Sequence, residues 1–191
     1  MRSPSGVAVL GSTGSIGVST LDVLARHPDR FKVVALGARS NAGRLREHCL
    51  VHEPRFAVLT DPAAAARLKA ELAAAGSVTQ VLAGDAALSE MAAHSEVEYV
   101  MAAIVGAAGL VPGLRALSHG TTLALANKES LVTAGPLLMR TAAAHGARVL
   151  PVDSEHSAIF QALQGEDIAA VERIILTASG GALRDWPLDA L

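Results

Sequence analysis

Short apolar runs alternate with longer amphipathic segments along the whole chain. The apolar runs predict β-strands at 7–10, 32–36, 56–59, 80–82, 99–102, 122–126, 148–152 and 173–177. The segments between them predict helices at 16–26, 42–51, 63–74, 86–93, 110–118, 130–144 and 155–163. Pro136 lies inside the sixth of these helices, where we expect a kink or a new start.

Strands that alternate with helices form parallel sheets covered by helices on both faces, so the pattern predicts an α/β fold. We expect one doubly wound, mostly parallel sheet as far as about Val152. After that residue, we expect the strands of the continuing βαβ pattern to belong to a different sheet.

Composition supports this fold class and excludes several classes of function. Of the 191 residues, 51% are hydrophobic and only 3% aromatic, which suits strands buried under alanine-rich helices. The net charge is -2 and no segment is dense in Lys or Arg, so we expect no nucleic-acid partner. We also expect no membrane span and no signal peptide, because every apolar run is too short for either. Cys49 is the single cysteine, which excludes an internal disulfide and fits a reducing, cytoplasmic location.

Three glycines follow the first predicted strand in the stretch "GSTGSIG". Gly11, Gly14 and Gly17 make G-x-x-G-x-x-G, in place of the usual dinucleotide fingerprint G-x-G-x-x-G. A strand, a glycine turn and a helix are nevertheless the context that this fingerprint requires. Amides near Thr13 to Ile16 are expected to face an anion at the helix N-terminus. The alternative is a glycine-rich turn that binds no ligand.

The second predicted strand ends in "LGARSN", where an NAD-preferring domain usually has an acidic residue. Arg39 supplies a cation there, and Ser40 and Asn41 supply a hydroxyl and an amide, which suit a 2′-phosphate. The sequence therefore favours NADP over NAD. The alternative is that Arg39 is a solvated loop residue and Asn41 caps a helix.

The stretch "LALANKESLV" brings Asn127, Lys128 and Glu129 to the carboxyl end of a predicted strand. Ligands of open α/β sheets bind at that edge. Lys128 can bind a phosphate or carbonyl oxygen of a substrate, and Asn127 and Glu129 can face a cofactor. The alternative is an ordinary helix start, with Glu129 favoured by the helix dipole.

The stretch "RVLPVDSEHSAIF" also ends a predicted strand in polar residues. If the chain stays extended through Ser154, the carboxylates of Asp153 and Glu155 project from one side, as hard oxygen ligands for Mg²⁺ or Mn²⁺. The alternative is a helix cap at Asp153 or Ser154, with Glu155 in the first turn. His156 falls on the opposite side and is not assigned to the site.

A further strand end, "LTASGG", places Ser179 in a flexible cluster of hydroxyl and amide groups that can cradle a phosphate. Three polar strand ends in one chain favour a single shared site.

Together these segments resemble the 1-deoxy-D-xylulose 5-phosphate reductoisomerase family, NADPH-dependent enzymes of the non-mevalonate isoprenoid pathway. The resemblance rests on "GSTGSIG", "MAAIVGAAGL", "LANKESLV", "PVDSEHSAIFQ" and "LTASGG", in that order. It implies that the pyrophosphate of NADPH is bound by Gly11, Thr13, Gly14, Ser15, Ile16 and Gly17. It implies that the 2′-phosphate is bound by Arg39, Ser40 and Asn41, and that Asn127 and Glu129 contact the cofactor elsewhere. It implies substrate binding by Lys128, Ser154, Glu155 and Ser179, a metal held by Asp153 and Glu155, and catalytic roles for Lys128, Asp153 and Glu155.

The family resemblance also implies how the chain is organised. Residues 1–150 are expected to form a Rossmann-like NADPH-binding domain, and residues 151–191 to begin an α+β catalytic domain. Family members are longer, so we expect this chain alone to be inactive and the full-length protein to be a homodimer. The implied reaction converts 1-deoxy-D-xylulose 5-phosphate, a sugar phosphate, into 2-C-methyl-D-erythritol 4-phosphate with NADPH and Mg²⁺ or Mn²⁺.

Two other functions stay open at the level of sequence. The chain could be another NADP-dependent reductase of a small carbonyl compound, in which Asp153 and Glu155 only begin a helix. It could also be a non-catalytic nucleotide-binding module.

Overall fold

A computed structural model describes residues 3–175 and 185–187 of the chain. The chain divides into two compact units, Met1–Leu150 and Pro151–Leu191. The larger unit holds almost the whole sheet.

The sheet has seven strands in the order β4-β3-β2-β1-β5-β6-β7. Every strand pair with an assigned register, from β4 through to β6, is parallel. The strand order reverses between β1 and β5, which makes that place the switch point of the sheet. The strands are β1 (Ser5–Leu10), β2 (Phe31–Ala38), β3 (Phe56–Leu59), β4 (Gln80–Ala83), β5 (Tyr99–Ala102), β6 (Thr122–Leu125) and β7 (Val149–Pro151).

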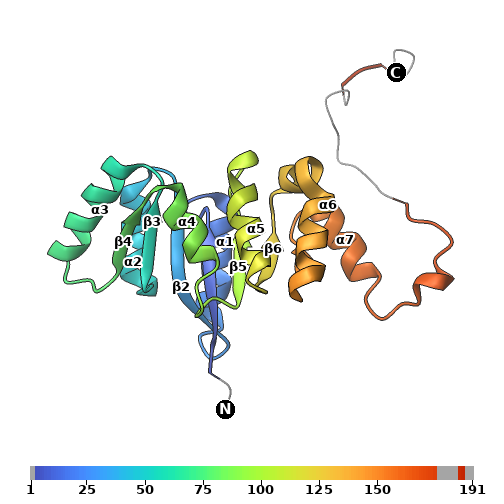
Figure 1. Cartoon of the computed structure of the whole chain (residues 1–191), viewed down its shortest axis with the longest axis horizontal. Helices are drawn as coiled ribbons and strands as arrows, with labels where there is room; N and C mark the ends of the chain where they lie inside the picture. Colours follow the sequence, from blue (N-terminus) through green and yellow to red (C-terminus); the bar gives the residue numbers. More distant parts are fainter. Residues whose placement is uncertain (1–2, 176–184, 188–191) are drawn as a thin grey trace. The chain divides into compact units, whose positions relative to one another are not determined.

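Helices cover both faces of the sheet (Figure 1). Buried residues of α1, α2 and α3 pack on one face, and those of α4, α5 and α6 on the other. The side chains of β1 alternate accordingly, because Val7 and Val9 face the first group while Ala8 and Leu10 face the second. The helices are α1 (Ser15–Arg26), α2 (Ala42–His52), α3 (Pro62–Ala74), α4 (Gly84–Ala92), α5 (Leu110–Ser118), α6 (Lys128–His145) and α7 (Ser154–Ala162), with 3-10 turns η1 (Ala107–Gly109) and η2 (Ile168–Ala170).

The structure confirms the predicted α/β class and the seven predicted helices. The break expected near Pro136 is present, since Ala134 has φ -143° and ψ 27° inside α6. Helix α6 begins at Lys128, two residues before its predicted start, which places Lys128 and Glu129 in its first turn.

The predicted strand at 173–177 is wrong for residues 173–175, which form no strand. Residues 176 and 177 lie outside the described part of the chain. A strand forms only where a neighbour completes its hydrogen-bond ladder. In the part of the chain that the structure describes, no strand pairs with residues 173–175.

None of the described helices is long and apolar enough to cross a membrane.

Candidate functional site

A cavity of about 450 Å³ opens at the carboxyl ends of β1, β2, β3 and β5, next to the switch point. Ligands of open α/β sheets bind at this position. The lining residues come from the loops that follow these strands and from α4: Gly11, Thr13, Gly14, Ala38, Arg39, Thr60, Asp85, Leu88, Ala103, Ile104, Val105 and Ala108.

The glycine loop forms the wall of the cavity after β1. Gly11 has φ +88°, and its amide donates to the Gly37 carbonyl at 2.8 Å. A Cβ at Gly17 would lie 2.3 Å from the Gly11 oxygen and 2.5 Å from the Ser12 Cα, so α1 packs directly on the loop backbone. Gly11 therefore makes the turn and Gly17 permits close packing.

Gly14 serves a different purpose in the same loop. It is the N-cap of α1 and no side chain caps this helix. A Cβ there would meet only the Gly11 oxygen, at 3.4 Å. Helix α1 therefore starts beside the cavity, at Gly14, with little in the way of an approaching group, and the amides of an uncapped helix start suit an anion. Ser15 and Ile16 begin the helix and are exposed.

The segment after β2 supplies the cation of the cavity. Arg39 is exposed and lines the cavity, while Asn41 caps α2 by accepting a hydrogen bond from the Arg44 amide at 3.1 Å. Ser40 lies between them and is exposed. The capping role considered for Asn41 is confirmed, and Arg39 occupies the wall expected to face a 2′-phosphate.

Asn127 is almost fully buried, with 3% of its surface exposed. Its Oδ1 accepts from the Ser130 amide at 3.1 Å, which caps α6. Its Nδ2 donates to the carbonyl of Ile104 and, at 2.7 Å, to that of Gly106. Both amide hydrogens are thus bound to the loop after β5, whereas Lys128 and Glu129 beside it are exposed.

In the second unit, Asp153 is the N-cap of α7. Its Oδ1 accepts from the His156 amide at 2.9 Å, and its Oδ2 lies 2.5 Å from the His156 Nδ1. The extended conformation considered for Ser154 is not found, because α7 begins at that residue; the alternative is confirmed, with Asp153 as the helix cap and Glu155 in the first turn. Residues two apart at a helix start do not share a face, so the same-side argument for Asp153 and Glu155 does not hold.

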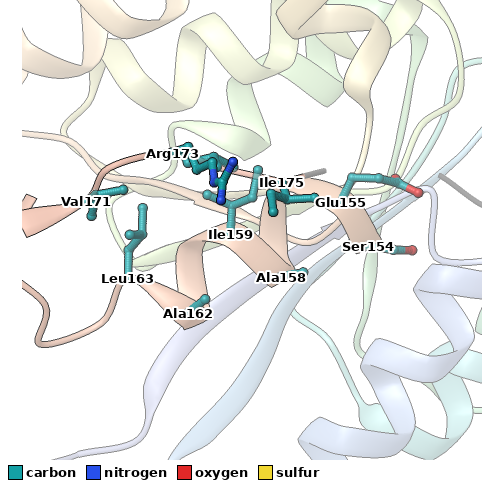
Figure 2. Close-up of a pocket in the computed structure, with 10 residues that line it drawn as sticks. Ser154, Glu155, Ala158, Ile159, Ala162, Leu163, Val171, Arg173 and Ile175 are labelled. Carbon is teal, nitrogen blue, oxygen red and sulfur yellow. The ribbon is translucent and has the colours of Figure 1, made fainter. Parts of the chain in front are cut away.

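A pocket of about 610 Å³ lies within the second unit. Figure 2 shows Ser154 and Glu155 at one end and Leu163 and Val171 at the other. Arg173 also lines this pocket, and its position was not foreseen from the sequence. Ser179, the remaining predicted substrate residue, lies outside the described residues.

Asp153 and Glu155 are hard oxygen donors of the kind that Mg²⁺ and Mn²⁺ prefer. Among the described residues, no group of three or more His, Cys, Asp and Glu side chains could hold a metal ion. The two donors fit such an ion in kind, and they would supply only part of its coordination shell. Cys49 is buried, and burial raises the pKa of its thiol to about 12, so the thiol stays protonated at neutral pH.

The family model for 1-deoxy-D-xylulose 5-phosphate reductoisomerase matches residues 7–135. The chain belongs to this family. A second model, for the C-terminal domain of the same enzyme, matches residues 149–191.

Curated reductoisomerases of bacteria are similar over nearly the whole chain. The enzyme of Jannaschia sp. (strain CCS1) is 58% identical over 185 residues, which are 97% of this chain and 46% of that protein. The enzyme of Methylococcus capsulatus is 55% identical over 192 residues, 97% of this chain and 49% of that protein. The chain thus spans about half the length of the curated reductoisomerases that it matches.

Solved reductoisomerase structures share the fold. The Zymomonas mobilis reductoisomerase in complex with NADPH is 46% identical with a TM-score of 0.90, and the match covers 100% of this chain and 50% of that one. A reductoisomerase structure with fosmidomycin and magnesium is 41% identical with a TM-score of 0.88, covering 97% of this chain and 48% of that one. A homoserine dehydrogenase from Thiobacillus denitrificans, 20% identical with a TM-score of 0.53 over 85% of this chain and 33% of that one, shares the fold alone.

The structure adds cavity residues that sequence reasoning did not assign. Thr60 follows β3 and Asp85 lies in the first turn of α4, directly after β4. The rule that singled out Arg39, a polar residue at the carboxyl end of a strand, could have found both. The stretch 103–105 lies in the quoted motif "MAAIVGAAGL", but its apolar side chains carry no chemical signal of their own.

Proposed function

We propose that Met1–Leu150 is a Rossmann-like domain that binds NADPH in the cavity beside the switch point, and that residues 151–191 begin the catalytic domain of a reductoisomerase. The observation that carries this proposal is the combination of an uncapped helix N-terminus at Gly14 and a cation at Arg39 in one cavity. Family membership and the NADPH complex of the similar Zymomonas mobilis enzyme support it.

Each phosphate of the cofactor has a matching group in this chain. The pyrophosphate is assigned to the backbone of Gly11, Thr13 and Gly14 and the first turn of α1, at Ser15, Ile16 and Gly17. The open space above Gly14 allows an anion to approach these amides. The 2′-phosphate is assigned to Arg39, with Ser40 and Asn41 beside it, since a guanidinium can pair with phosphate through two hydrogen bonds.

The substrate and metal assignments rest on residues at the starts of α6 and α7 and on Ser179. Lys128 is exposed at a helix start and is proposed to hold an oxygen of the sugar phosphate, with Glu129 beside the cofactor. Ser154, Glu155 and Ser179 are proposed to bind the substrate, and Asp153 and Glu155 to hold Mg²⁺ or Mn²⁺. When bound, NADPH supplies hydride and the divalent ion acts as a Lewis acid.

The whole reaction is proposed for a protein of the length of the similar reductoisomerases. It converts 1-deoxy-D-xylulose 5-phosphate to 2-C-methyl-D-erythritol 4-phosphate, and Lys128, Asp153 and Glu155 are its catalytic residues in this chain. We propose that this chain alone does not turn over substrate. We also propose that the full-length protein is a homodimer and that it is cytoplasmic; the single cysteine of this chain fits a reducing compartment.

Calorimetric titration of the purified chain with NADPH and with NADH tests the cofactor assignment. We expect NADPH to bind at least about tenfold more tightly, because the 2′-phosphate adds a charge-assisted contact with Arg39. A folded chain that binds neither dinucleotide, or both equally, contradicts the proposal.

A further inference from the structure

The side chain of Asn127 joins segments that are distant in sequence. Its Nδ2 donates to carbonyls 23 and 21 residues earlier, those of Ile104 and Gly106. Its Oδ1 holds the Ser130 amide in the first turn of α6. One buried amide thus holds both the loop after β5 and the start of the helix that carries Lys128.

The loop that Asn127 holds is a wall of the proposed cofactor cavity, since Ile104 and Val105 line it. Asn127, which the family resemblance assigns to the cofactor, is itself not among the lining residues of that cavity, and its Nδ2 is bound to the loop. Gly109 makes room for its amide, because a Cβ at Gly109 would lie 2.9 Å from the Asn127 Nδ2. The contact between Asn127 and the loop therefore depends on three places in the chain: Asn127 itself, the carbonyls of Ile104 and Gly106, and the space at Gly109.

The first part of α6 is separated from the body of that helix. Ala134 leaves the helical conformation, and Pro136 cannot donate a backbone hydrogen bond to the preceding turn. The break weakens the positional restraint that the rest of α6 can exert on its first turn. The hydrogen bonds of Asn127 supply another restraint on Lys128.

We infer that Asn127 is a positioning residue that holds the loop at 103–106 and the Lys128 turn in one arrangement. This inference rests on the proposed NADPH site. A cofactor with its 2′-phosphate at Arg39 after β2 would cross the switch point, which would bring its nicotinamide half to the β5 side. Asn127 therefore acts on the nicotinamide half of the site through the loop.

Two variants separate this role from helix capping. Asn127→Asp keeps the shape and an acceptor for the Ser130 amide but loses both donors, and Asn127→Ser keeps an uncharged cap that is too short to reach the loop. We expect the Kd for NADPH to rise about tenfold in each. The Kd for adenosine 2′,5′-bisphosphate, which lacks the nicotinamide half, is expected to stay within about twofold.

Hydrogen exchange of the ligand-free chain provides a readout that needs no cofactor. We expect faster exchange at 103–109 and at 127–133 in both variants and in Gly109→Ala, whose Cβ displaces the amide. Thr79→Val is the matched control. It removes another buried hydrogen bond to a backbone carbonyl, Thr79 Oγ1 to Pro54 at 2.8 Å, at the start of β4 and away from the cavity.

The outcomes are distinguishable. A parent chain that does not bind NADPH rejects the proposed function. A parent that binds NADPH, with variants whose affinity or whose exchange at either segment matches the parent, overturns the positioning role. An equal loss of both ligands in the Asn127 variants, or the same ligand split in Thr79→Val, overturns it as well, because general destabilisation then explains the effect.

Discussion

Arg39 follows β2 at the position where NAD-binding domains of this fold carry an acidic residue. It lines the cavity together with Asp85, which has the opposite charge. A carboxylate at position 39 would hydrogen-bond a free ribose hydroxyl and repel a phosphate, whereas a guanidinium favours the phosphate. At the scale of single residues, the proposed preference for NADPH therefore rests on this side chain.

Replacing Arg39 by Ala is expected to weaken NADPH binding by about 10- to 100-fold, the range of a hydrogen bond to a charged group. NADH lacks the 2′-phosphate, so its Kd is expected to change little. Calorimetry with both dinucleotides measures the difference. Arg67→Ala is the control, because Arg67 lies on α3 and only approaches Glu71, at 4.0 Å. Equal effects of the two substitutions would falsify the assignment of Arg39.

Gly17 is required by packing in the ligand-free chain. We expect Gly17→Ala to lower the free energy of unfolding by about 2 kcal/mol or more, because its Cβ would overlap backbone atoms that cannot rotate away. Gly43→Ala is the matched control, since a Cβ at Gly43 has no neighbour within 4 Å. Removing a glycine inside α2 is expected to stabilise by up to about 1 kcal/mol. Urea unfolding of both variants measures the contrast, and two equal changes contradict the packing argument.

At the scale of elements, the helices that begin near the proposed sites differ in how they are capped. Asn41, Asn127 and Asp153 cap α2, α6 and α7 with their side chains. Helices α1 and α4 both begin beside the cavity without a side-chain cap, but α4 has the carboxylate of Asp85 in its first turn, whereas the first turn of α1 has no acidic residue. The unsatisfied amides of a helix start are suited to an anion. The open cap and the lack of a carboxylate together support α1 as the helix proposed for the pyrophosphate.

Asp153 has two possible roles that one substitution separates. Asn is also a good N-cap, so Asp153→Asn keeps α7 but loses a carboxylate. If Asp153 holds the metal, the affinity of the chain for Mn²⁺, measured by electron paramagnetic resonance with NADPH present, is expected to fall about tenfold or more.

The control for this experiment is Asp167→Asn in the same unit. Asp167 caps η2 by accepting from the Ala169 amide at 2.9 Å, so the substitution makes the same chemical change at another cap. Equal Mn²⁺ affinities in the two variants, or no Mn²⁺ binding by the parent, would leave Asp153 as a helix cap alone.

At the scale of the whole molecule, partly buried imidazoles make stability depend on pH. The His94 ring packs on Phe56 with centroids 4.9 Å apart, and its Nδ1 accepts from the Glu96 amide at 3.2 Å. Burial lowers the pKa of His94 below its ordinary value of 6.5, and the nearby charges of Arg55 and His119 lower it further. Burial likewise lowers the pKa of His48 and His52.

Because these pKa values are lower in the folded chain, the unfolded chain binds more protons below pH 6.5. The free energy of unfolding is therefore expected to be highest above that pH and to fall as the pH drops through the folded-state pKa values. Urea unfolding across this range measures the slope, and His94→Gln is expected to reduce it. A stability that rises on acidification would contradict the prediction.

Elements set by contacts between neighbouring residues could be predicted from the sequence, whereas those set by contacts between distant residues could not. Strands such as Phe56–Leu59 and helices such as Leu110–Ser118 were predicted at their observed bounds, because their apolar pattern repeats within a few residues. The strand at 173–177 was not, since a strand depends on a partner elsewhere in the chain. Arg39 could be placed at a strand end, but Thr60 and Asp85 came together with it only through the order of the strands.

The sequence by itself determined the α/β pattern, the glycine turn at Gly11 and the charge at the end of β2, because backbone sterics, periodicity and side-chain chemistry act locally. Only the tertiary structure decided that α7 begins at Ser154, that the Asn127 amide holds a loop 23 and 21 residues away, and that the start of α1 is left open. Each of these depends on which donors and acceptors the fold brings together. Buried polar groups must find such partners wherever the chain places them.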